Sequence, residues 1–243
     1  MNATRQFPRP PWSNYRRMPE MLLAVYTVVW LVTAIRPADR QTWLFENLLV
    51  FVVLPTLIFT YKKFQFSNLS YVLIGVFLAL HAVGANYTYS EMPLGNWFRD
   101  DWQLTRNHYD RIVHLIFGLL ITFPLWEFAV RRFGLSIGWS CVAAIHVLIA
   151  WSSIYELLEA LVAHVTSPAL GAAYNGTQGD EWDSQKDMAL ALLGSVVCMA
   201  VTATWWRRAP RRTRVPFAHT PSVTPINGAS LANRGQRELT GAR

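Results

Sequence analysis

Residues 109–130, YDRIVHLIFGLLITFPLWEFAV, form an apolar run that ends directly before Arg131 and Arg132. A helix over this run would be about 33 Å long, which matches a bilayer core of about 30 Å. A basic pair directly after such a run is typical of a membrane helix that ends at the cytoplasmic surface. The segment therefore predicts a transmembrane helix, and with it a membrane fold.

Five further segments have the length and apolar character of transmembrane helices. We predict six membrane helices, over residues 18–36, 42–61, 68–89, 109–130, 134–165 and 185–206. The predicted fold class is all-α, a polytopic membrane helical bundle. The fifth segment would reach about 48 Å as a helix, so it must tilt or rise out of the bilayer. Gly134 and Gly138 at its start form a GxxxG pattern, which indicates close helix packing.

Composition agrees with a membrane protein and argues against nucleic acid as a partner. Of the 243 residues, 52% are hydrophobic and only 15% are charged, whereas soluble domains carry about 25% charge. The formal net charge is +7, but the basic residues lie in short clusters beside the apolar segments and form no basic stripe. Membrane lipids are therefore the expected partners. Cys141 and Cys198 lie inside apolar segments, which excludes a disulfide framework and a zinc-type cysteine spacing.

Lys and Arg residues are distributed unevenly between the two sets of segment ends. One set carries 13 of them and the other carries four: Arg5, Arg9, Arg16, Arg17, Lys62, Lys63, Arg131, Arg132, Arg207, Arg208, Arg211, Arg212 and Arg214, against Arg36, Arg40, Arg99 and Arg106. The positive-inside rule then places both termini in the cytoplasm. We expect a basic, Pro-rich lead-in over residues 1–17, a membrane domain over 18–206, and a disordered basic tail over 207–243.

Ionisable side chains inside the predicted spans gather toward the outer face of the membrane. Such residues are costly in a bilayer, which makes them functional candidates. Counting along each helix from its basic end places nine candidates in this outer layer: Glu46, His81, Asp110, His114, Glu156, Glu159, Asp180, Asp183 and Asp187. Any one acid there could also be a plain interfacial or helix-capping residue. As a set they favour a polar cavity that is open to the outside.

Two of these candidate pairs have helical spacing. Asp110 and His114 lie four positions apart and share a helix face. This spacing suits two ligands of one metal ion, a carboxylate that orients an imidazole, or a hydrogen bond that only packs the helix. Glu156 and Glu159 lie three positions apart, and a metal ion or an arginine would offset the cost of burying them. Arg106 and Arg111 are the nearest candidate cations in the predicted topology.

The densest polar run is residues 175–188, NGTQGDEWDSQKDM. Its glycines allow a tight loop, and Asp180, Asp183 and Asp187 then lie along one stripe of a helix that begins there. Carboxylates at a helix N-terminus are favoured by the helix dipole even without a metal. The run therefore predicts either a ligand stripe or a simple helix start.

Three functions remain open from these residues. The first is a metal-dependent, membrane-embedded enzyme acting on a lipid or envelope substrate. In it, Mg, Mn or Zn would be held by Asp110, His114, Glu156, Asp183 and Asp187, and Glu159 or Glu156 would serve as the base. The second is an ion- or proton-coupled transporter. The third is an assembly or interaction partner whose polar layer serves helix packing. No nucleotide-binding motif or nucleophile elbow occurs in the sequence.

The order of the motifs resembles the YjdF-like family of bacterial inner-membrane proteins, a family of uncharacterised function. The similarity covers about residues 20–206 and is most specific in its last block. Its matching residues are Tyr109-Asp110-Arg111 with His114, Tyr155-Glu156 with Glu159, Gly179-Asp180, Trp182-Asp183 and Gln185-Lys186-Asp187-Met188. The resemblance implies a multi-pass location in the inner membrane and implies no reaction. A looser similarity, at Asp187 and Gly194, is to VanZ-like membrane proteins.

Overall fold

A computed structural model describes residues 17–166, 171 and 177–208. The predicted lead-in and tail lie outside these residues, except for Arg17, Arg207 and Arg208. Within them the chain is all-helical, as predicted. The elements are α1 (Met18–Ile35), α2 (Arg40–Glu46), α3 (Leu48–Thr60), α4 (Asn68–Tyr87), η1 (Tyr89–Glu91), α5 (Pro93–Asp101), α6 (Tyr109–Phe133), α7 (Ile137–Val165) and α9 (Asp183–Arg208).

Five of these helices are long and apolar enough to cross a membrane, namely α1, α4, α6, α7 and α9. The predicted second span, residues 42–61, is not one continuous helix. It is the pair α2 and α3, bent by 41° at Asn47, and the described residues hold six spans if this pair counts as one. The short helix α5 lies outside the spans and was not among the predicted segments, because its length and polar character give no membrane signal.

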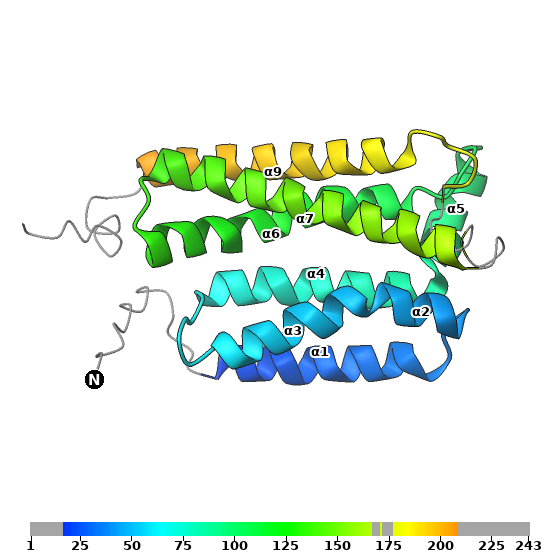
Figure 1. Ribbon diagram of the computed structural model, residues 1–243, viewed down its shortest axis with the longest axis horizontal. Helices are drawn as coiled ribbons and strands as arrows, with labels where there is room; N and C mark the ends of the chain where they lie inside the picture. Colours follow the sequence, from blue (N-terminus) through cyan, green and yellow to red (C-terminus); the bar gives the residue numbers. More distant parts are fainter. Residues whose placement is uncertain (1–16, 167–170, 172–176, 209–243) are drawn as a thin grey trace, which may run out of the picture.

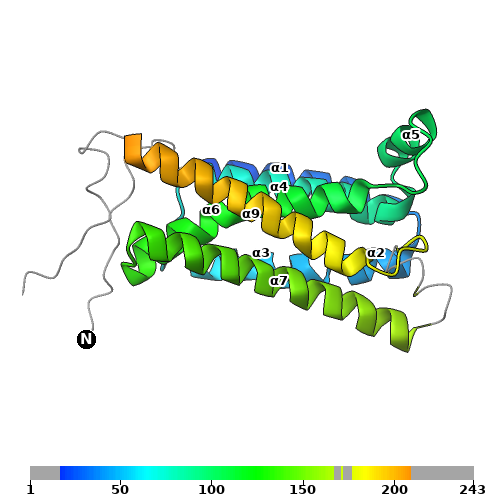
Figure 2. The same cartoon turned by 90° about the horizontal axis from the view of Figure 1, so that it is seen from above.

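The helices form two groups that run side by side (Figure 1). One group holds α1, α4 and the bent pair α2/α3, and the other holds α6, α7 and α9. Helices α4 and α6 form the main contact between the two groups, whereas α6 packs extensively on α9. Helix α1 begins and α9 ends at the same end of the bundle. We call this the basic end, because Lys62, Lys63, Arg131 and Arg132 lie there, and the opposite end the acidic end. A view from above places α5 at the acidic end (Figure 2).

Local side-chain chemistry sets several of the helix boundaries. Ser67 caps α4 by accepting a hydrogen bond from the Ser70 amide at 3.2 Å, as N-cap serines do. Gly134 ends α6 with a left-handed φ of 66°, a conformation that glycine adopts without strain. Helix α7 begins only after Ser136, so the predicted fifth helix starts at Ile137 rather than at residue 134.

The bend between α2 and α3 is held by the Asn47 side chain, which is completely buried. Its Oδ1 accepts a hydrogen bond from Trp30 Nε1 at 2.6 Å, and its Nδ2 donates to the Trp43 carbonyl oxygen at 2.7 Å. The His81 ring approaches the Glu46 carbonyl oxygen at 3.0 Å through Nε2. The break therefore supplies a backbone acceptor to a buried histidine.

Helices α6 and α9 approach each other closely at two glycines. A Cβ atom on Gly118 would overlap the Ala191 carbonyl oxygen, and one on Gly194 would overlap the Leu115 carbonyl oxygen. Small residues at membrane helix contacts permit this backbone approach. The prediction of close packing at the GxxxG pattern was wrong, since a Cβ on Gly134 or Gly138 would meet no atom of the described residues within 4 Å.

Glu127 joins α4 to α6 at the basic end. Its carboxylate accepts hydrogen bonds from the Ser67 amide at 2.8 Å, the Ser67 hydroxyl at 2.7 Å and the Ser70 hydroxyl. It also pairs with Arg131 one turn along α6, and Arg131 Nη1 donates to the Gln65 carbonyl oxygen at 2.8 Å. Both carboxylate oxygens of Glu127 thus accept hydrogen bonds, which marks this acid as structural.

Candidate functional site

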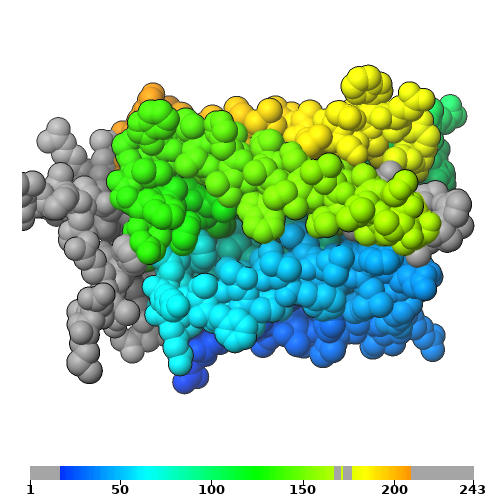
Figure 3. Space-filling model, in the orientation of Figure 1, coloured from blue at the N-terminus to red at the C-terminus, as the bar shows by residue number. Residues whose placement is uncertain are grey.

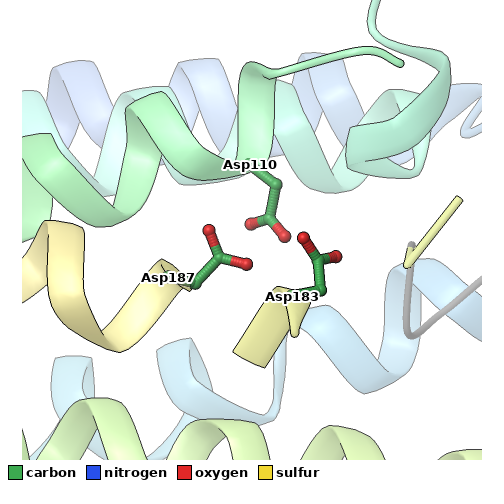
Figure 4. Close-up of side chains that lie close together, drawn as sticks. All are labelled: Asp110, Asp183 and Asp187. Carbon is green, nitrogen blue, oxygen red and sulfur yellow. The ribbon is translucent and has the colours of Figure 1, made fainter. Parts of the chain in front are cut away.

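Asp110, Asp183 and Asp187 converge at the acidic end of the bundle. Asp110 lies in the first turn of α6, and Asp183 and Asp187 lie in the first two turns of α9. One oxygen from each carboxylate lies within 4.8 Å of the other two (Figure 4). The three side chains point toward one another between the two helices. The close α6–α9 contact at Gly118 and Gly194 holds these helix starts together.

A network of ion pairs shares Asp183 with this cluster and links the loop before α6 to the start of α9. Arg106 pairs with Asp183 through its two terminal nitrogens, Nη1 and Nη2, with Nη2 3.0 Å from Oδ2. Arg111 reaches Asp183 Oδ1 at 3.0 Å and also pairs with Asp180. Lys186 Nζ lies 2.6 Å from Asp180 Oδ2. Two arginines thus neutralise Asp183.

Asp180 of this network and the neighbouring His108, whose Nδ1 lies 3.4 Å from Arg111 Nη1, have shifted pKa values. Hydrogen bonds from Lys186, the Trp182 amide and Arg111 hold the pKa of Asp180 well below its ordinary value. Burial, together with the nearby charges of Arg111 and Arg106, lowers the pKa of His108. The network therefore favours a charged aspartate and a neutral histidine.

The loops of the network are tied by backbone and amide hydrogen bonds. Gln178 Oε1 accepts from the Asn107 amide at 2.9 Å, and Gln178 Nε2 donates to the Asn107 carbonyl oxygen at 3.1 Å. Asn107 Oδ1 accepts from the Tyr109 amide at 2.9 Å and so forms an Asx turn directly before α6. These bonds fix the positions from which Arg106 and Asp110 project.

A second group of polar side chains shares Asp110 and Asp187 with this cluster and adds His114, Glu156 and Glu159. His114 Nε2 is 3.7 Å from Asp110 Oδ1 and 3.4 Å from Glu156 Oε1. Glu159 is 5% exposed and lies about one turn along α7 from Glu156. The four carboxylates Asp110, Glu156, Glu159 and Asp187 form no ion pair with a lysine or arginine in the described part of the chain.

Several polar atoms of this group are buried without a hydrogen-bond partner among the described residues. They are Asp187 Oδ1, Glu156 Oε1 and His114 Nδ1. A buried polar atom without a partner costs about 1–3 kcal/mol, and a charged one costs more. The group therefore needs protons or a bound cation to neutralise it.

Glu46 and His81 lie beside this group, toward the other half of the bundle. The Tyr155 hydroxyl donates to Glu46 Oε2 at 2.5 Å, which links α7 to α2. His81 Nε2 donates to the Glu46 carbonyl oxygen at 3.0 Å, and His81 Nδ1 lies 2.6 Å from the Tyr89 hydroxyl, from which it accepts when the ring is neutral. Both ring nitrogens of His81 therefore have a hydrogen-bond partner, and the residue lies at the edge of the site.

The structure brings most predicted site residues together, and three residues outside the predicted set contact them. Arg106, Tyr155 and Tyr89 contact site residues that lie as many as 109 positions away in the chain. Arg106 was predicted only as a nearby positive charge. No local pattern marks such partners, because their pairing depends on the helix packing.

Together these features define a multi-pass helical membrane protein with a buried acidic and histidine site at one end. The chain belongs to the predicted membrane protein family DUF2238, which matches residues 18–208. It is 34% identical over 188 residues to the inner membrane protein YjdF of Escherichia coli (strain K12). That match covers 76% of this chain and 89% of the relative. These findings confirm the YjdF-like family and the multi-pass location in the inner membrane; they do not show the looser similarity to VanZ-like proteins. No solved structure matches the chain significantly.

Proposed function

We propose that the protein binds a divalent metal ion at the acidic end and acts as a membrane-embedded enzyme on a lipid or envelope substrate. The observation that carries this proposal is the convergence of Asp110, Asp183 and Asp187, with Asp187 Oδ1 buried and without a hydrogen-bond partner among the described residues. Ligands at about 2.0–2.6 Å from one ion lie no more than about 5 Å apart, so a spacing of 4.8 Å suits a shared cation.

The donor set indicates which ions would fit. Carboxylate oxygens suit Mg and Mn, and an imidazole ligand such as His114 adds Zn to the choice. Asp110 and Asp187 are the better candidate ligands, since Asp183 is already paired with two arginines. Glu156 faces His114 and could complete the set.

Such an ion would polarise a phosphoryl or carbonyl oxygen, or lower the pKa of a bound water. We assign the role of the base to Glu159, which is buried about one turn along α7 from Glu156 and has no ion pair in the described residues. It would accept a proton from the attacking group. Asp110, His114 and Tyr155 also line one end of a long groove between the two helix groups. A lipid-borne group could reach the acids along this route.

Metal content tests the proposal directly. We would purify the protein in detergent with Mg, Mn or Zn, measure bound metal by elemental mass spectrometry, and record the melting temperature with and without chelator. We expect bound metal, a lower melting temperature in chelator, and loss of both effects in Asp187→Asn. Asp100→Asn is the matched control, because Asp100 is an exposed acid at the same end. Protein that carries no metal and melts identically in chelator would overturn the proposal.

The reaction is tested separately with an inner-membrane lipid extract. Wild-type protein with metal should change at least one lipid or lipid-linked species detected by mass spectrometry, and Glu159→Gln should not, although it should still retain metal. An unchanged extract with metal-loaded protein would leave a metal site without lipid chemistry and would refute the enzymatic half of the proposal.

One observation favours a second function, an ion- or proton-coupled transporter. The span α2/α3 is broken at Asn47, next to Glu46 and His81, and discontinuous helices form the ion sites of many transporters. Proteoliposomes that show a proton flux abolished by His114→Ala would favour this function over the enzyme.

A further inference from the structure

A long groove runs between the two helix groups. It has a volume of about 1480 Å³, its walls are α3 and α7, and its floor is formed by α4 and α6. Figure 3 shows the α7 surface lying directly above the α3 surface on this face. Along α6 the lining extends from Asp110 to Arg132, a rise of about 33 Å. The groove therefore covers the full thickness of a bilayer core of about 30 Å.

The walls of the groove are apolar through its middle. Val53 and Leu57 of α3 face Ile121 and Leu125 of α6 and Val147 of α7 across it. Small-molecule sites usually measure about 300–1,000 Å³, so this groove is larger and more elongated. Its shape and lining suit a hydrocarbon chain that lies parallel to the helices.

The two ends of the groove carry opposite charge. Asp110 and His114 line the acidic end, whereas Lys62, Lys63 and Arg132 line the basic end. These three basic side chains are exposed and form no ion pair within the described residues. Arg131 differs, because Glu127 already binds it. Only the basic end can attract an anionic group without help from a cation.

We infer that the groove binds an anionic phospholipid, with the phosphate at Lys62, Lys63 and Arg132 and one acyl chain in the apolar middle. Basic pockets between membrane helices bind anionic lipid headgroups in this way. A chain from one leaflet reaches about half of the bilayer core, so it would end near Ile121 and leave the acidic end accessible. The inference does not depend on the proposed metal site.

Lipid binding to the purified full chain tests this inference. Native mass spectrometry in detergent, with chelator present, would compare phosphatidylglycerol with phosphatidylcholine of the same acyl chains. We expect tighter binding of phosphatidylglycerol. Replacing Lys62, Lys63 and Arg132 together by glutamine should weaken that binding on the order of 100-fold at low salt, at about 1 kcal/mol per charge. The double variant Arg207→Gln/Arg208→Gln is the control, because neither arginine lines the groove.

A second pair of variants tests the acyl chain. Val147→Trp would fill the groove, whereas Val142→Trp places the same bulk on an exposed part of α7 outside the groove. Only Val147→Trp should weaken phosphatidylglycerol binding. Equal affinity for the two lipids, unchanged binding in the triple glutamine variant, or equal effects of the two tryptophans would each overturn the inference.

Discussion

Replacing Glu127 by alanine tests how α4 and α6 are held together at the basic end. Glu127 is 2% exposed and accepts hydrogen bonds from the Ser67 amide and hydroxyl, the Ser70 hydroxyl and Arg131. The alanine variant removes these bonds and leaves Arg131, which is 7% exposed, without its carboxylate. The Gln65 carbonyl oxygen remains as its acceptor.

Breaking a buried ion pair by removing one partner costs about 3–5 kcal/mol. We expect about 3 kcal/mol here, because Arg131 keeps the carbonyl bond and the basic end lies near the polar interface. For a chain of this size, that corresponds to a drop in melting temperature of roughly 6–12 °C. Thermal unfolding in detergent, followed by circular dichroism, measures it.

Two further variants make this test specific. Glu20→Ala removes an exposed acid at the same end of the bundle and should change the melting temperature little. Glu127→Ala/Arg131→Ala should recover part of the loss, because no unpaired charge remains buried. If Glu127→Ala melts at the temperature of Glu20→Ala, the carboxylate does not hold the two helices and the reasoning fails.

Four other variants have defined effects on stability. Gly118→Ala should cost about 1–3 kcal/mol, because its Cβ would overlap the α9 backbone, whereas Gly138→Ala should be neutral or stabilising by up to about 1 kcal/mol; equal effects would contradict the packing described. Asn47→Ala should cost about 1–3 kcal/mol, because the Trp30 indole N–H loses its acceptor, and an unchanged Trp fluorescence spectrum would argue against this. Because the folded pKa of His108 is lowered, the stability that it contributes is full above its unfolded pKa of about 6.5 and is lost as pH falls below that value. His108→Gln should flatten this part of the pH profile, and an identical pH dependence in the variant would refute the assignment.

The membrane fold follows from the sequence because bilayer thickness imposes a fixed length on each apolar segment. The Asn47 bend did not follow, since residues 42–61 are apolar enough for one span, and the break depends on a tertiary hydrogen bond from Trp30. The prediction that Gly134 and Gly138 mark a close helix contact was also wrong. Gly118 and Gly194 lie on different helices, so no local spacing marks their contact.

The candidate site was predictable in part, because helix rise converts sequence position into depth. Depth alone places Asp110, Asp183 and Asp187 in one layer, and the structure shows them converging. Depth does not give rotation about the helix axis or the path of a loop. The pairing of Arg106 with Asp183 required both, and whether these acids hold a metal stays a prediction.

The contact of α4 with α6 has a mechanical consequence for the whole bundle. The two helix groups meet mainly along these helices, and the walls of the groove, α3 and α7, belong to different groups. A small rotation of one group about this contact would widen or narrow the groove while leaving the packing inside each group intact. The Tyr155–Glu46 hydrogen bond joins α7 to α2 at the acidic end, so it would limit how far the groove can widen there.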